Sequence, residues 1–458
     1  MKKVVSIISM LVLGSQLSTM AQSSWSAVGS GLNLPVTTLA ADTTNNLLYA
    51  GGVFTQTGFL PAIGVAKWNG STWSQVGGGI VSGLGITSMI IKDGELIVGG
   101  TFTNIGGILA KNIARWNGST WSPLGNGLEY TGATTVSTML QYNGELYAGG
   151  TFTSSGSTTV NYIAKWNGTS WQPLGSGTNG NVTALCVYDG SLYVGGTFTV
   201  AGGVPVKNIA KWDGTVWSDV GNGVDYTGAT TVSTMKAFAG ALYVGGTFTT
   251  AGSTAVNNIA KWDGAVWSDV GNGVDYTGAT TVSTMLIMGN ELWVGGRFNI
   301  AGGTAAGNIA KWDGTTWSAI GSGMSYTVSS LEKLGNHIYA GGAFLVAGGK
   351  LIPFIAQSSS ERSLETMAVT ENNSEAFTLY PNPATTEVNF KINNSEKFTA
   401  DTRYNFTLAD AFGKEVLRIE NTSGAVSLDR KKLATGIYYY RILATDGQLI
   451  QNGKINIE

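Results

Sequence analysis

The sequence predicts an all-β fold, and three observations lead to that prediction. Of 458 residues, 66 are Gly and only 12% are charged, which indicates many tight turns, while 43% are hydrophobic, too many for a disordered chain. Tryptophan recurs in a W-[SQ]-x-[VLI]-G-x-G frame at Trp25, Trp73, Trp121, Trp171, Trp217, Trp267 and Trp317. A Gly-Gly pair alternates with this frame, starting at Gly51, Gly99, Gly149, Gly195, Gly245, Gly295 and Gly341.

The N-terminus has the pattern of a secretory signal peptide. Lys2 and Lys3 precede an apolar run over residues 4–13, and small residues follow up to Ala21. A run of ten residues is too short to span a bilayer, so a permanent membrane anchor is the less favoured alternative. We expect a signal peptide over residues 1–21, cleaved after Ala21.

Each repeat predicts four short strands. In one repeat the strands are residues 182–187, 192–196, 209–212 and 216–220, and Asp-Gly pairs at Asp189 and Asp213 provide hairpin turns of the type that needs positive φ. Four antiparallel strands per unit and seven units predict a seven-bladed β-propeller over residues 22–357.

The two ends of this region are predicted to form one blade together. The chain opens with a lone fourth strand at Trp25, and the last repeat has a third strand near Ile355 but no Trp-bearing fourth strand after it. We expect the N-terminal strand to complete the last blade and close the ring, which removes open sheet edges.

Length variation predicts which loops carry function. From each Gly-Gly pair to the next frame Trp the distance is always 22 residues, whereas from that Trp to the next Gly-Gly pair it is 26, 26, 28, 24, 28, 28 and 24. The variable segment contains the crossing between blades, and strand parity puts it at the same end of the blade as the loop between the second and third strands. Binding residues concentrate on such loops.

Three of these crossings contain a carboxylate followed by a tyrosine, and a fourth contains the tyrosine without the carboxylate. The candidate ligand-binding residues are Glu129, Tyr130, Asp225, Tyr226, Asp275, Tyr276 and Tyr326. They could bind sugar hydroxyls or a cation through charge-assisted hydrogen bonds and stacking. Alternatively, Tyr fills the gap between blades and the acid caps a turn.

Composition excludes several classes of protein. A net charge of −2 gives no electrostatic footprint for nucleic acid, and the single Cys186 and His337 leave no metal site, so we expect no metal or cofactor.

A glycan-active hydrolase or lyase using Glu129, Asp225 or Asp275 is the alternative function. Because these carboxylates occupy equivalent positions and form no unique acid–base pair, we expect a non-catalytic, monomeric binding protein for a glycan or protein ligand.

The repeated motifs resemble kelch-like and galactose-oxidase-type propellers over about residues 25–357. The resemblance implies the fold and no activity, because the copper chemistry of galactose oxidase has no matching ligands beyond the isolated His337 and Cys186.

The C-terminal region differs from the repeats. A polar linker is expected over residues 358–375, and a second β domain over 376–458. Its motifs are Tyr-Pro-Asn-Pro at 380–383, Ala-Phe-Gly at 411–413, Gly-Ile-Tyr at 436–438 and Gly-Lys at 453–454. The candidate sorting residues are Tyr380, Pro381, Asn382, Pro383, Gly413, Gly436, Tyr438, Gly453 and Lys454.

This region resembles the type A C-terminal sorting domain of the type IX secretion system of Bacteroidetes. The resemblance implies a small Ig-like β-sandwich that the outer-membrane translocon and its sortase machinery recognise and cleave. It also implies Sec export followed by release or attachment at the cell surface. An unrelated Ig-like binding module is the alternative.

Overall fold

The computed structural model describes residues 25–275, 280–359, 377–380, 387–392, 403–410, 415–423, 425–429, 433–445 and 449–457. The predicted signal peptide and residues 360–375 of the predicted linker lie outside these residues, whereas Ser358 and Ser359, predicted as the start of the linker, belong to a strand. The chain divides into two compact units, Met1–Glu361 and Arg362–Glu458. The residues described in both units form strands, turns and loops without a helix, which confirms the all-β prediction, and they include no helix of the length and apolarity that crossing a membrane requires.

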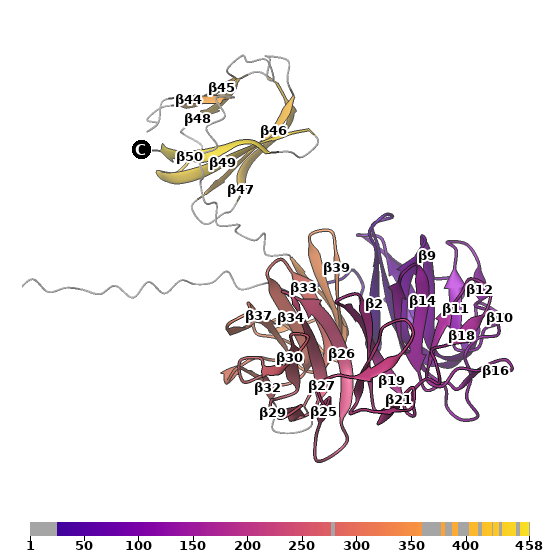
Figure 1. Cartoon of the computed structure of the whole chain (residues 1–458). Helices are drawn as coiled ribbons and strands as arrows, with labels where there is room; N and C mark the ends of the chain where they lie inside the picture. Colours follow the sequence, from indigo (N-terminus) through magenta and orange to yellow (C-terminus); the bar gives the residue numbers. More distant parts are fainter. Residues whose placement is uncertain are drawn as a thin grey trace, which may run out of the picture. The chain divides into compact units, whose positions relative to one another are not determined.

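The main antiparallel sheets of the first unit follow one another along the chain (Figure 1). Six of them are four-stranded, the sheet of β8 has a fifth strand, β10 (Ile108–Leu109), and smaller two- and three-stranded sheets accompany them. The first strands are β2 (Val36–Asp42), β8 (Ile80–Lys92), β13 (Val136–Tyr142), β19 (Val182–Tyr188), β26 (Thr231–Phe238), β33 (Thr281–Met288) and β39 (Val328–Leu334). The second strands are β3 (Leu47–Gly52), β9 (Glu95–Ile105), β14 (Glu145–Gly150), β20 (Ser191–Gly196), β27 (Ala241–Thr247), β34 (Glu291–Arg297) and β40 (His337–Gly342).

The outer half of each sheet carries the tryptophans. The third strands are β6 (Val65–Trp68), β11 (Ile113–Trp116), β17 (Ile163–Trp166), β23 (Ile209–Trp212), β30 (Ile259–Trp262), β37 (Ile309–Trp312) and β43 (Ile355–Ser359). The fourth strands are β7 (Trp73–Gln75), β12 (Trp121–Pro123), β18 (Trp171–Pro173), β24 (Trp217–Asp219), β31 (Trp267–Asp269), β38 (Trp317–Ala319) and, for the β39 sheet, β1 (Trp25–Ala27).

The two kinds of tight turn use different chemistry. Between first and second strands, Asp93, Asn143 and Asp189 have φ of 53°, 50° and 46°, as the Asp-Gly and Asn-Gly pairs predict. Between third and fourth strands the prediction of positive φ at Asn or Asp is wrong. There only the glycine is left-handed, with φ of 94° at Gly70, and the Asn69 side chain accepts hydrogen bonds from the next backbone N–H groups instead.

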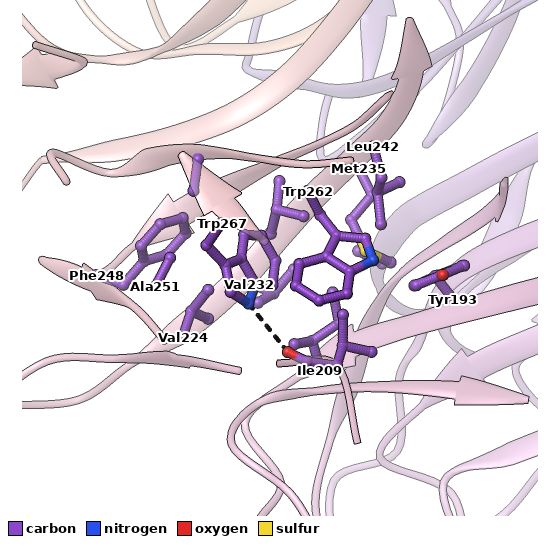
Figure 2. Close-up of a cluster of buried hydrophobic side chains, with 14 of the residues drawn as sticks. Tyr193, Ile209, Val224, Val232, Met235, Leu242, Phe248, Ala251, Trp262 and Trp267 are labelled. Carbon is purple, nitrogen blue, oxygen red and sulfur yellow. Dashed lines mark hydrogen bonds between the residues drawn. The ribbon is translucent and has the colours of Figure 1, made fainter. Parts of the chain in front are cut away.

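The core of this unit lies between neighbouring sheets. Figure 2 shows Trp262 and Trp267 side by side, 5.2 Å between ring centroids, against Tyr193 and Ile209 of the preceding sheet. Trp267 also donates an Nε1–H hydrogen bond of 3.0 Å to the Val220 carbonyl, at the end of that same preceding sheet. The tryptophans therefore join one sheet to the next through both apolar packing and a hydrogen bond.

The first and last parts of the unit meet in one sheet. β1 pairs antiparallel with β43, with Trp25 opposite Ser358 and Ala27 opposite Ala356. The first strands β2 and β39 also contact each other, and the Leu39 N–H donates a 3.1 Å hydrogen bond to Ser330 Oγ. Residues more than 300 positions apart in the chain thus form neighbouring strands.

In several sheets, an asparagine side chain links the sheet to the crossing that follows it through two hydrogen bonds. Asn258 has φ of 62°, is 8% exposed, accepts a hydrogen bond from the Phe248 N–H and donates one to the Val274 carbonyl. Asn112 and Asn308 make equivalent pairs of bonds. Asparagine suits this position because its side chain tolerates the left-handed region and satisfies two backbone groups.

We therefore predict a graded loss of stability at Asn258. Asn258→Gly keeps the backbone conformation but loses both hydrogen bonds, so the free energy of unfolding should fall by about 2 kcal/mol. Asn258→Ala adds left-handed strain of about 1 kcal/mol to that loss. Denaturant unfolding of both variants measures the difference, and an alanine variant as stable as the glycine variant would contradict the strain argument.

The second unit is a two-layer β-sandwich. One sheet contains β44 (Phe377–Tyr380), β45 (Glu387–Ile392) and β48 (Val426–Asp429); the other contains β46 (Tyr404–Asp410), β47 (Glu415–Thr422), β49 (Gly436–Ala444) and β50 (Leu449–Ile457). Phe390 of the first sheet packs edge-on against Phe406 and Tyr440 of the second, at centroid distances of 4.7 and 4.8 Å.

Candidate functional site

The crossings between sheets pair with the hairpins that join second to third strands. β25 (Val224–Asp225) pairs with β28 (Thr250–Ala251), and β32 (Val274–Asp275) pairs with β35 (Ile300–Ala301). Glu129 forms an equivalent isolated bridge with Ser154. We call these crossings and hairpins together the loop layer. The loop layer lies at the strand ends opposite the tight turns, as strand parity predicts.

Two of the candidate carboxylates form ion pairs within the loop layer. Lys111 Nζ lies 2.8 Å from Glu129 Oε1, and Lys207 Nζ lies 2.9 Å from Asp225 Oδ2. The hydrogen bond from Lys207 lowers the pKa of Asp225, and the Tyr226 backbone N–H adds to the effect. The pairs are exposed enough that each adds only about 0–1 kcal/mol of stability, so their main effect is to orient the two carboxylates.

Sequence reasoning missed both lysines. Each stands ten residues before a frame Trp, at a position where other repeats carry Asn, Ile, Gly or Pro, so no recurring pattern marked it. A search for opposite charges 18 residues apart across the third and fourth strands would have found Lys111 with Glu129 and Lys207 with Asp225.

One predicted alternative was that the acid caps a turn, but the Glu129 and Asp225 carboxylates do not accept the hydrogen bonds of the neighbouring hairpin. In the crossings with the shorter 24-residue spacing, Asn179 Oδ1 and Ser325 Oγ accept hydrogen bonds from hairpin N–H groups. Where Glu129 or Asp225 occupies this position, the backbone carbonyl accepts the hairpin N–H instead, at 2.8 and 3.0 Å respectively. The carboxylate side chains remain directed to the lysines.

The described tyrosines of the set lie on the surface. Tyr130, Tyr226 and Tyr326 are 47%, 42% and 45% exposed. The rings of Tyr130 and Tyr226 fold over Gly132 and Gly228 of their own loops, close enough to leave no room for a Cβ at Gly228. The Arg297 guanidinium lies 5.0 Å from the centroid of the Tyr326 ring. These three rings therefore do not fill the space between sheets.

One crossing takes part in a cavity of about 350 Å³. Glu129, Tyr130 and Lys111 line one part of it, and Ser82, Thr101 and Thr103 line another. The latter part arises because β8 and β9 continue past the sheet into the loop layer, where Ile80 pairs with Ile105. The sequence predicted two short strands here, so this extension was also missed.

The other candidate residues belong to separate crossings. Asp225, Tyr226 and Tyr326 do not line this cavity, and Asp275 pairs through β32 with a different hairpin. Tyr276 lies outside the described residues. The described part of the chain contains no group of three or more His, Cys, Asp or Glu side chains able to hold a metal ion.

Several residues of the sorting motifs lie in paired strands. Tyr380 ends β44, Gly436 and Tyr438 lie in β49, and Gly453 and Lys454 lie in β50. These last two strands are neighbours, with Tyr438 opposite Ile455 and Tyr440 opposite Gly453, and the Tyr438 hydroxyl donates a hydrogen bond to the Ala434 carbonyl. Pro381, Asn382, Pro383 and Gly413 lie outside the described residues.

Comparison with known families identifies both parts of the chain in outline. Residues 378–457 match the secretion system C-terminal sorting domain. This domain directs proteins through the type IX secretion system, so the chain is exported and is either secreted or held at the cell surface, and it interacts with the secretion machinery. Residues 92–118 and 189–211 match a β-propeller domain of unknown function (DUF5122), in agreement with a propeller-like first unit.

Comparisons with individual proteins give weaker likeness. No curated protein matches the chain. Among solved structures, the extracellular domain of a one-component system from B. thetaiotaomicron shares 12% identity at a TM-score of 0.45, covering 95% of this chain and 58% of its own. The extracellular domain of a hybrid two-component system from the same organism shares 12% identity at a TM-score of 0.45, covering 93% and 55%. The chain therefore spans less than three fifths of the length of these structures.

Proposed function

We propose that the first unit is a closed seven-bladed β-propeller that binds a glycan through its loop layer, without catalysis, after export by the type IX system. The ring is supported by contacts between successive first strands, which include the contact of β2 with β39, and by the β1–β43 pairing. In such a ring every sheet has two neighbours to pack against.

The cavity beside Glu129 and Tyr130 is the observation on which the binding proposal rests. An exposed aromatic ring offers the apolar surface that a sugar ring stacks on. The Glu129 carboxylate, held by Lys111, and the Ser82, Thr101 and Thr103 hydroxyls offer hydrogen-bonding partners for sugar hydroxyls. A cavity of about 350 Å³ accommodates a short stretch of a polysaccharide chain.

The state of the carboxylates favours binding over hydrolysis. A general acid must carry its proton near neutral pH, which requires a raised pKa. The pKa of Asp225 is instead lowered by the hydrogen bond from Lys207. Glu129 forms an ion pair with Lys111 at 2.8 Å, which directs its carboxylate to the lysine. These carboxylates suit the acceptance of hydrogen bonds, which is the role we assign to them.

A polysaccharide array tests the proposal. Residues 22–458 are applied to neutral and acidic plant, algal and bacterial polysaccharides, and retained protein and released reducing ends are both measured. Selective retention is expected, and Tyr130→Ala should weaken it at least about tenfold through lost stacking. Tyr226→Ala, in an equivalent loop away from the cavity, is the matched control and should bind as the wild type does.

Two outcomes would contradict the proposal. If no polysaccharide is retained, the glycan class is wrong. If reducing ends accumulate with the wild type but not with Glu129→Gln, while that variant still binds, the protein is a glycan-active enzyme.

A further inference from the structure

Large apolar side chains are exposed on one sector of the loop layer. They belong to the β39, β2 and β8 sheets and to the crossings that enter the last two of these. We call this set the apolar sector: Leu34, Val53, Phe59, Leu60, Ile63, Val81, Leu84, Leu109, Leu345 and Leu351, each between 41% and 100% exposed. In the other crossings, the described loop-layer residues with comparable exposed apolar area are the tyrosines Tyr130, Tyr226 and Tyr326.

The apolar sector breaks the repeat at positions where other sheets are polar or small. Ile63 and Val81 occupy the places of Lys111 and Glu129, so an exposed apolar pair replaces an ion pair. The position of Phe59, at a hairpin tip, is Gly or Ser in every other repeat. Because the polar versions fold in the same molecule, the scaffold does not require these apolar side chains.

Backbone contacts join several of these residues into one surface. The Ile80 N–H donates to the Ile63 carbonyl at 3.0 Å, which places Val81 beside Ile63. A Cβ at Gly85 would lie 3.1 Å from the Val53 side chain, so Val53 lies against the backbone of β8 at the residue that follows Leu84. Contiguous exposed apolar surface on a soluble domain is characteristic of an interface.

Charge indicates what covers this surface. The loop segments 29–36, 53–64, 77–86 and 100–110 contain no Asp, Glu, Lys or Arg, and segment 343–354 adds only Lys350. An uncharged surface can meet an identical copy of itself without repulsion between like charges, which a charged one cannot. Closed two-fold pairs of identical surfaces are the commonest oligomers.

The ends of the first unit leave room for such a contact. The chain enters at Trp25 and leaves at Ser359, and Ser359 pairs with His337 directly after a tight turn. Both ends therefore lie at the tight-turn end of the β39 sheet, whereas the apolar sector lies at its loop-layer end. Two copies that meet through their loop layers keep all four chain ends away from the contact.

We propose that the apolar sector joins two copies of this chain into a symmetric dimer. Phe59, fully exposed at its hairpin tip, inserts between apolar side chains of the second copy. This differs from the monomer expected from the sequence. The apolar sector adjoins the glycan cavity, because Leu109 belongs to the sector and also lines that cavity. The two proposals are tested separately, since one is measured by sedimentation and the other by retention on polysaccharides.

Sedimentation velocity of residues 22–458 over a concentration series tests the dimer. The wild type should show a reversible monomer–dimer equilibrium below about 100 µM. Phe59→Ser/Leu60→Thr grafts the residues of another hairpin tip, Ser157 and Thr158, and should raise the dissociation constant at least about tenfold. Ile63→Lys/Val81→Asp grafts the Lys207–Asp225 pair and should have the same effect.

A matched control is Val216→Thr, which removes an exposed apolar side chain at a tight turn and copies Thr316. It should leave the dissociation constant unchanged. Because all the substituted side chains are exposed, melting temperatures of the dissociated proteins should stay equal. A wild type that is monomeric at every concentration, or grafted variants that dimerise as well as the wild type, would overturn the proposal.

Discussion

Deletion of residues 22–31 is expected to lower the melting temperature of the protein by about 10 °C or more. The deletion removes Trp25 and Val28, both fully buried, and the Val28 carbonyl that accepts the Trp73 indole hydrogen bond at 2.8 Å. Truncating one buried Trp alone costs about 3–5 kcal/mol. In a domain of this size each kcal/mol lowers the melting temperature by about 2–4 °C. Differential scanning calorimetry measures the shift.

Two Trp→Phe variants compare the stability contributed by the Trp of β1 with that contributed by the Trp of another fourth strand. Trp171 donates its indole hydrogen bond to the Leu124 carbonyl, whereas the buried Trp25 indole nitrogen has no partner among the described residues. Trp171→Phe should therefore cost about 1 kcal/mol more than Trp25→Phe. A deletion variant that melts at the wild-type temperature would refute closure of the ring by the N-terminal strand.

Deletion of residues 362–458 is expected to abolish delivery to the cell surface and medium. The deleted unit matches the secretion system C-terminal sorting domain, so without it a chain that has crossed the inner membrane should accumulate in the periplasm. Cell fractionation and immunoblotting in a bacterium with a type IX system measure the distribution. The effect should be nearly complete, because delivery depends on recognition of this unit.

Two point variants separate recognition from folding of that unit. Phe406→Ala removes a fully buried ring from the sandwich core and should cost about 3–5 kcal/mol, a large share of the stability of so small a domain. Export should then fall. Ile437→Ser changes a side chain that is 47% exposed and should be exported normally. Normal export of the deletion variant would show that the signal lies elsewhere.

The regular part of the fold was predictable from the sequence because its causes are local. Asp-Gly and Asn-Gly pairs mark several of the tight turns, and the Gly-Gly pair and the frame Trp recur at the same spacing in six repeats because they meet the same neighbours. The same logic predicted the β1–β43 strand arrangement from the missing fourth strand. All of these signals repeat, so one sequence contains several copies of each.

The candidate site was predictable only in part, because its geometry depends on positions that do not repeat. Glu129 and Tyr130 were found as a motif, but Lys111 is shared with only one other repeat. The cavity exists because β8 extends into the loop layer, which depends on the tolerance of Gly83 and Gly85 for φ near 150°. No periodic signal accompanies such an extension. For the same reason, no pattern in the sequence distinguished the exposed Phe59 from other loop residues.

The position of β43 has a mechanical consequence. If the C-terminal unit is held while the first unit is pulled, the tension enters the propeller-like unit at Ser359. β43 is hydrogen-bonded on one side to β40 and on the other to β1, so two ladders share the load. Without β1, β43 would lie at the edge of its sheet, attached by one ladder. The pairing with β1 thus makes β43 harder to separate from its sheet when tension is applied at Ser359.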